Sequence, residues 1–182
     1  MARVLVAAFA AALTAVSSSD GGSAPVGASR SVPPPLSTQA CRVVPGQTLE
    51  TYYPVMPGWE RGEPKAETDT QESVSRTTVD FDRGVSTISV ELMDSCRNPD
   101  VLAMMTESLK QPPPSTPDTV VRLLTINGFP GYEEWTSESG HGEVHVLVAG
   151  RFMVKVTAET SDRTTLENAA TLIPMQKLAA LK

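Results

Sequence analysis

The sequence lacks an apolar run long enough to cross a bilayer. The longest, from Val4 to Val16, has about 13 residues, whereas a membrane-spanning helix needs about 20. We therefore expect no membrane span in the mature chain. A cysteine close behind this run is also missing, since the first cysteine is Cys41, and this argues against a lipid-anchored lipoprotein.

Motifs of common enzymes are also missing. The chain has no G-x-S-x-G, no phosphate-cradling glycine loop, no H-E-x-x-H and no Cys/His nucleophile pair. We expect no cofactor and favour a non-enzymatic role, without excluding an enzyme. Basic clusters are absent too, and the formal net charge is −6. An acidic chain of this kind argues against nucleic acid as a partner.

The N-terminus has the three parts of a secretory signal peptide. Arg3 is basic, Val4 to Val16 is apolar, and small residues follow at Ser17 and Ser18. We predict a signal peptide over residues 1–18 and export to the periplasm or out of the cell. Residues 19–48 are rich in Ser, Gly and Pro and predict a disordered tether. Residues 49–182 are long enough for one compact domain.

Cys41 and Cys96 are the two cysteines of the chain. Disulfides form and persist in exported proteins, so a bridge between them is the expected state. It would close a loop of about 55 residues and stabilise the fold by roughly 4 kcal/mol in the chain-entropy model. A redox pair is the alternative, although the chain has no C-x-x-C motif.

Apolar alternation predicts several strands. Short strands are expected over residues 49–59, ending in a Pro and Gly turn, and over 59–67. Residues 75–81 and 88–92 form a clear hairpin. With Arg83 and Gly84 as its two-residue loop, Val79 would lie opposite Ile88. Further strands are predicted over residues 120–126, 131–137, 143–148 and 152–157, with Val148 opposite Phe152 across a three-residue loop.

Capping residues predict two helices. Asn98 followed by Pro99 starts a helix that runs to Lys110. Ser161 or Asp162 caps a second helix, which Pro174 interrupts before a last turn or two. Residues 111–118 carry four prolines and predict a loop. The expected fold class is α+β, an antiparallel β-sheet built from hairpins with two helices packed against one face.

His141, Glu143 and His145 form the sharpest candidate site, because they include both histidines of the chain. In a strand all three share one face. The two histidines would then lie about 13 Å apart, too far to reach one zinc ion together. A metal site would therefore use Glu143 with one histidine, unless a turn at Gly140 and Gly142 folds His141 back. A solvated hairpin end is the favoured interpretation.

Glu133 and Glu134 lie between Tyr132 and Trp135. Neighbouring strand residues point to opposite faces, so the two glutamates cannot act as a paired acid and base. The favoured interpretation is aromatic packing with one glutamate in a salt bridge. Either glutamate can still lie near Glu143 on the neighbouring strand.

The order of several turn motifs resembles a group of uncharacterised exported bacterial proteins. These motifs are Pro57-Gly58-Trp59, Asn127-Gly128-Phe129-Pro130-Gly131, Val148-Ala149-Gly150-Arg151-Phe152 and Lys177-Leu178-Ala179-Ala180-Leu181. The layout is more distantly similar to the Mog1/PsbP-like fold of small secreted lipoproteins and photosystem accessory proteins. This resemblance implies an α+β sandwich and an accessory or binding role, and it carries over no catalytic residue.

Two functions follow from the sequence. The leading hypothesis is a non-enzymatic domain that binds an unknown protein or small-molecule ligand outside the cytoplasm. The rival is a metal-binding or metal-dependent protein that uses His141, Glu143 and His145.

Overall fold

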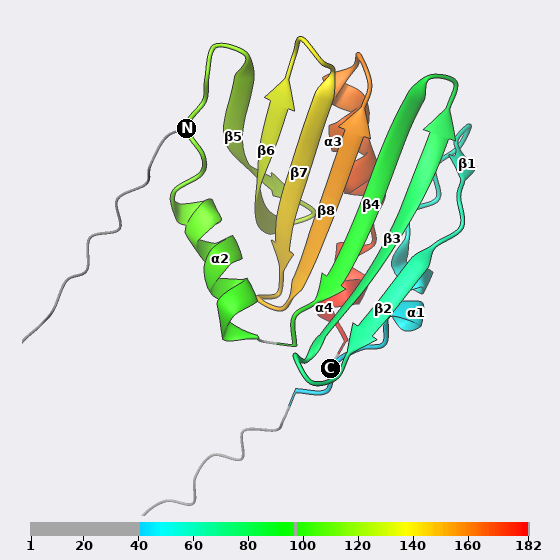
Figure 1. The fold of residues 1–182 in the computed structure, drawn as a ribbon, viewed down its shortest axis with the longest axis vertical. Helices are drawn as coiled ribbons and strands as arrows, with labels where there is room; N and C mark the ends of the chain where they lie inside the picture. Colours follow the sequence, from blue (N-terminus) through cyan, green and yellow to red (C-terminus); the bar gives the residue numbers. More distant parts are fainter. Residues whose placement is uncertain (1–40, 97, 182) are drawn as a thin grey trace, which may run out of the picture. The chain divides into compact units, whose positions relative to one another are not determined.

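The structure, a computed structural model, describes residues 41–96 and 98–181 (Figure 1). The predicted signal peptide, residues 1–18, and the part of the predicted tether up to residue 40 lie outside the described residues. Among the helices of the described part, none is long and apolar enough to cross a membrane.

Eight strands form one antiparallel sheet (Figure 1). Their order across the sheet is β1-β3-β4-β8-β7-β6-β5, and β2 also pairs with β3. The strands are β1 (Glu60–Arg61), β2 (Lys65–Asp69), β3 (Val74–Arg83), β4 (Ser86–Asp94), β5 (Thr119–Ile126), β6 (Phe129–Thr136), β7 (His141–Val148) and β8 (Phe152–Glu159). The expected antiparallel sheet is therefore present.

The β3–β4 hairpin corrects the predicted register. Arg83 pairs with Ser86, so the two-residue loop is Gly84 and Val85. Val79 consequently lies opposite Val90 and not opposite Ile88. Gly84 has φ +63°, and a type II′ hairpin turn places its glycine first in the loop. Because the register differs by two residues, the apolar side chains keep the predicted face.

The β7–β8 hairpin matches its prediction. Val148 pairs with Phe152 across a three-residue loop, and Leu147 pairs with Met153 on the opposite face. The β5–β6 hairpin turns on Asn127 and Gly128, with φ +53° and +87°. This dipeptide is the preferred type I′ turn, because both of its central positions need positive φ.

The sheet has two distinct faces, which we name the core face and the open face. On the core face alternate residues of the central strands are buried: Val79, Phe81, Ile88, Val90, Leu92, Val144, Val146, Val148, Phe152, Val154, Val156 and Ala158. The open face carries the residues between them, most of which are half-buried. The alternation that predicted the strands therefore also separates the core from the surface.

Two longer helices begin where the capping residues predict. The side chain of Asn98 accepts hydrogen bonds from the backbone of Asp100 and Val101 and starts α2 (Pro99–Lys110). Asp162 caps α3 (Arg163–Leu172) by accepting from the backbone of Thr164 at 2.9 Å. Beyond Pro174 the chain forms α4 (Met175–Ala179).

The predicted strand over residues 49–59 is wrong. The chain there forms a helical turn, α1 (Gly46–Leu49), which continues as a 3-10 turn, η1 (Glu50–Tyr52). Pro45 precedes α1, and its carbonyl accepts from the backbone N–H groups of Thr48 and Leu49. Leu49, Tyr53 and Met56 are buried, so the apolar signal of this segment comes from side chains that enter the core from a helical turn and the chain after it, and not from a strand.

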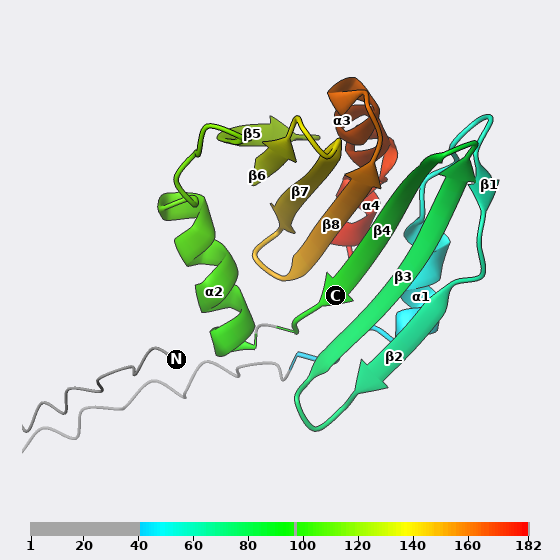
Figure 2. The ribbon, with the colours of Figure 1, turned by 45° about the horizontal axis from the view of Figure 1, so that its top comes forward.

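The helices lie at different places on the sheet. α3 contacts β7 and β8, whereas α2 contacts β6, and the two helices lie apart in both views (Figures 1 and 2). Ser108 of α2 lies near Tyr132, whose ring belongs to the open face. α2 therefore does not share the core face with α3, contrary to the prediction. Only Met105 of α2 is buried, while α3 buries Leu166, Ala169 and Ala170.

The expected Cys41–Cys96 disulfide is present, with a Cα–Cα distance of 5.6 Å. It ties the segment before α1 to the link between β4 and α2. Val44 is also buried against the core. Contacts with the sheet thus begin before the predicted boundary at Leu49.

Candidate functional site

The three predicted residues of β7 lie together on the open face. Glu143 occupies the centre, because strand residues two apart point the same way. Its carboxylate is 2.9 Å from Nε2 of His145 and 3.8 Å from Nε2 of His141. Lys155 of β8 completes the group, with its Nζ 2.8 Å from Oε1 of Glu143. We name these four residues the Glu143 cluster.

Tyr132 fixes the ring of His145. The two residues are register partners on β6 and β7, and their rings stack 4.7 Å apart with planes 6° from parallel. Tyr132 is buried, and its burial raises the pKa of its phenol. The stack orients His145, whose side chain is only 15% exposed, toward Glu143.

The Glu143 cluster keeps its carboxylate ionised. The hydrogen bond with His145 and the ammonium group of Lys155 outweigh partial burial and lower the pKa of Glu143 to about 2. Glu134 is the register partner of Glu143 on β6, and Glu91 is the partner of Lys155 on β4. The open face consequently presents charges of both signs across four strands, with Lys155 between the carboxylates of Glu91 and Glu143 and a further carboxylate, Glu134, beside Glu143.

The cluster has the residue types of a metal site but not its arrangement. Zinc needs several ligand atoms at about 2 Å from one point. Within residues 41–96 and 98–181, no group of three or more His, Cys, Asp or Glu side chains is placed to hold a metal ion. The ammonium group of Lys155 already contacts Glu143, at the position where a cation would bind.

Glu133 and Glu134 point to opposite faces. Glu133 is fully buried on the core face, where Nε of Arg122 donates to it at 2.5 Å and Arg163 of α3 donates through both Nε and a terminal nitrogen. Burial acts to raise the pKa of Glu133, but the two arginines outweigh it and the pKa is lowered. Arg122 also pairs with Glu167 of α3. This glutamate is the salt-bridged one that the sequence favoured.

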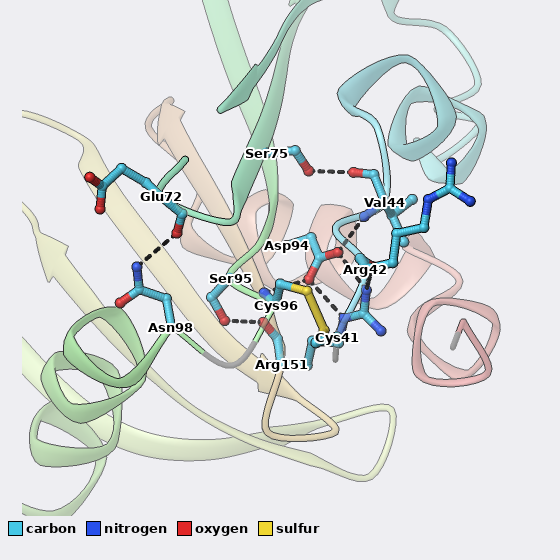
Figure 3. The surroundings of a disulfide bond; sticks show 10 residues. All are labelled: Cys41, Arg42, Val44, Glu72, Ser75, Asp94, Ser95, Cys96, Asn98 and Arg151. Atoms are coloured by element: carbon cyan, nitrogen blue, oxygen red, sulfur yellow. Dashed lines mark hydrogen bonds and ion pairs between the residues drawn. A yellow bond between two sulfur atoms is a disulfide. The ribbon is translucent and has the colours of Figure 1, made fainter. Parts of the chain in front are cut away.

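A second buried ion pair, which was not predicted from the sequence, lies beside the disulfide. Asp94 accepts hydrogen bonds from the backbone N–H groups of Val44 and Cys96, and from two nitrogens of Arg151 at 2.8 and 2.7 Å (Figure 3). Arg151 also donates to the carbonyl oxygen of Arg42 at 2.9 Å. These bonds join the N-terminal segment, the end of β4 and the β7–β8 loop.

The Asp94 pair had a signal in the sequence. Asp94 continues the alternation of Val90 and Leu92, so it occupies a core position where a charge needs a partner. The sequence does not identify the basic residue that pairs with Asp94. Arg151 is separated from Asp94 by 57 positions, and only the β4–β8 pairing brings them together.

A shallow depression lies on the open face of β2 and β3. Lys65, Glu67, Arg76 and Thr78 line it. Arg76 lies 3.9 Å from Glu67 and 4.0 Å from Glu91, both long for ion pairs. The depression extends the mixed charge of the open face toward the sheet edge.

No protein-family model, curated protein or solved structure matches this chain. The resemblance to the Mog1/PsbP-like fold therefore stays a prediction.

Proposed function

We propose that this chain is a non-enzymatic binding or accessory domain that acts in the periplasm or outside the cell. Its binding surface is the open face around the Glu143 cluster. One observation carries this proposal: the cluster is ordered by a ring stack and two short polar contacts, yet its side chains stay partly exposed, from 15% for His145 to 44% for His141. Ordered charges on an accessible surface are suited to recognition, because little side-chain entropy is lost on binding.

Two features support the compartment. The Cys41–Cys96 disulfide is of the kind that persists in oxidising compartments. The predicted signal peptide over residues 1–18 points the same way. An accessory role also agrees with the resemblance of the sequence to the Mog1/PsbP-like fold.

The chemistry of the open face favours a protein partner. Lys155 and Glu91 lie side by side on β8 and β4, and Tyr132 and His145 supply a stacked aromatic pair beside them. A row of both charge signs suits a protein surface with the complementary pattern, because such patterns orient two partners and exclude wrong ones. The formal net charge of −6 adds no attraction for polyanions.

Site-specific photocrosslinking in the native exporting cell tests the proposal. A photoreactive amino acid at Thr157, the β8 neighbour of Glu143, should yield one discrete adduct with a partner protein. The matched control has the same group at Asn168, an exposed residue of α3, and should yield none. Lys155→Glu should remove the Thr157 adduct. Equal adducts at both positions, or an adduct that survives Lys155→Glu, would contradict the proposal.

The metal hypothesis for His141, Glu143 and His145 makes a different prediction. Protein purified without a histidine tag would contain stoichiometric zinc or copper, and Glu143→Gln would lose it. Elemental analysis of the wild type and this variant separates the two functions, because a binding domain of the proposed kind keeps its adduct after treatment with a chelator.

A further inference from the structure

The two edges of the sheet are protected in different ways. The outer edge of β2 carries Lys65, Glu67 and Asp69, and charged side chains are a common protection against edge-to-edge pairing. β5, at the other edge, is mostly apolar, and Val120 and Leu123 are 42% and 56% exposed. An exposed apolar edge strand is a template for pairing with other chains unless the protein blocks it, so β5 needs another protection.

The backbone of β5 shows which groups face outward. In an antiparallel strand, alternate residues turn both backbone groups toward the neighbouring strand or away from it. The carbonyl of Asp118 accepts from the backbone of Ser137 on the β6 side. Odd-numbered residues of β5 therefore turn their N–H and C=O groups to the free edge.

The loop at residues 111–118 binds two of these outward-facing residues. The hydroxyl of Ser115 accepts from the N–H of Val121 at 2.9 Å and donates to its carbonyl at 3.3 Å. The hydroxyl of Thr116 accepts from the N–H of Thr119 at 3.0 Å, and the N–H of Thr116 donates to the carbonyl of Thr119 at 2.9 Å. Together they satisfy the outer backbone groups of both strand residues.

This loop cannot extend the sheet. Prolines at 112, 113, 114 and 117 have no N–H to donate to another strand. The loop therefore satisfies the first half of the β5 edge without presenting a new edge. In the described part of the chain, the outward backbone groups of Leu123 and Thr125 have no such partner.

We propose that residues 111–118 are an edge guard that keeps β5 from pairing with β5 of a second copy. An antiparallel pairing centred on Leu123 would join Val121 of one copy to Thr125 of the other, so it requires Ser115 to leave Val121. In that register Arg122, the one charged residue of β5, lies opposite Leu124. No like charges meet, so a second copy fits the unguarded edge.

The experiment compares Ser115→Ala with Ser161→Ala, a change at an exposed serine before α3. Hydrogen exchange measures the Val121 amide, and sedimentation equilibrium measures self-association. We expect Ser115→Ala to lose protection at Val121 in dilute samples and to associate about tenfold more tightly, since the guard's hydrogen bonds no longer compete with pairing. Ser161→Ala should behave as wild type in both measurements.

Adding Leu123→Lys to Ser115→Ala places two lysines opposite each other at the centre of the pairing and should restore the wild-type association constant. Thr116→Ala is a second, independent variant of the edge guard, and it should remove the protection of the Thr119 amide from hydrogen exchange. The proposal is overturned if the Val121 amide exchanges equally fast in wild type and Ser115→Ala. It is also overturned if protection is lost without tighter association, or if Leu123→Lys leaves the association unchanged.

Discussion

Carboxylates on both faces of the sheet pair with basic side chains, but those on the core face are buried and the one on the open face is partly exposed. Asp94 and Glu133 on the core face are fully buried, and each joins segments that are distant in the chain. Glu143 on the open face is 25% exposed and joins only the neighbouring strands β7 and β8. A buried charge without its partner is costly, whereas an exposed one is solvated. The core-face pairs therefore hold the fold, and the open-face cluster is available to a partner.

Of the three carboxylates, Asp94 should make the largest contribution to the free energy of unfolding. Asp94→Ala leaves Arg151, whose side chain is 10% exposed, without its counter-ion and frees the N–H groups of Val44 and Cys96. We expect the free energy of unfolding to fall by about 3 to 5 kcal/mol, measured by urea denaturation with the disulfide intact. A loss below 1 kcal/mol would show that the disulfide alone fixes this corner.

Neutralising Glu133 should cost less. Arg122 and Arg163 have side chains 43% and 30% exposed, so both can turn to water when Glu133→Gln removes the charge. We expect a loss of about 1 to 3 kcal/mol in the same denaturation experiment. Glu134→Gln, the neighbouring change on the open face, is the matched control and should be close to neutral. Equal losses for the two variants would remove the distinction between the faces.

The Glu143 carboxylate should make the smallest contribution to the free energy of unfolding, and this contribution should depend on pH. Its pKa is about 2 in the folded chain against an ordinary value of 4.5, so its contribution is present above pH 4.5 and disappears as the pH falls toward 2. Because the group is partly exposed, we expect about 1 kcal/mol at most. Thermal unfolding of Glu143→Gln should approach that of wild type near pH 2, and an undiminished difference there would contradict the assignment.

The sequence predicted local features of the fold well. Alternation located the central strands. Capping signals at Asn98 and at Ser161 or Asp162 located both longer helices, because these signals depend on near neighbours. Two predictions failed for different reasons. The β3–β4 register was wrong by two residues because Gly84 is the first residue of the two-residue loop and not the second, which is a local choice of turn. The helical turn at Gly46–Leu49 depends on a distant contact, the burial of Leu49 in the core.

The candidate site was predictable only in part. His141, Glu143 and His145 share a face because of strand periodicity alone, which the sequence contains. Lys155 joins them opposite His145 through the β7–β8 register, which the hairpin prediction already implied, whereas Tyr132 joins them through the β6–β7 register, which the sequence did not predict. These two residues give the cluster its order and its charge balance, so the sequence identified its centre but not its chemistry.

The most direct test measures partner binding and stability on the same variant of the Glu143 cluster. In the triple variant Glu143→Gln, His145→Ala, Lys155→Ala, the photocrosslinking group at Thr157 reports on binding, and urea denaturation confirms that the chain is folded. Our account predicts that the adduct disappears while the free energy of unfolding stays within about 1 to 2 kcal/mol of the parent. An undiminished adduct in the folded triple variant would contradict it.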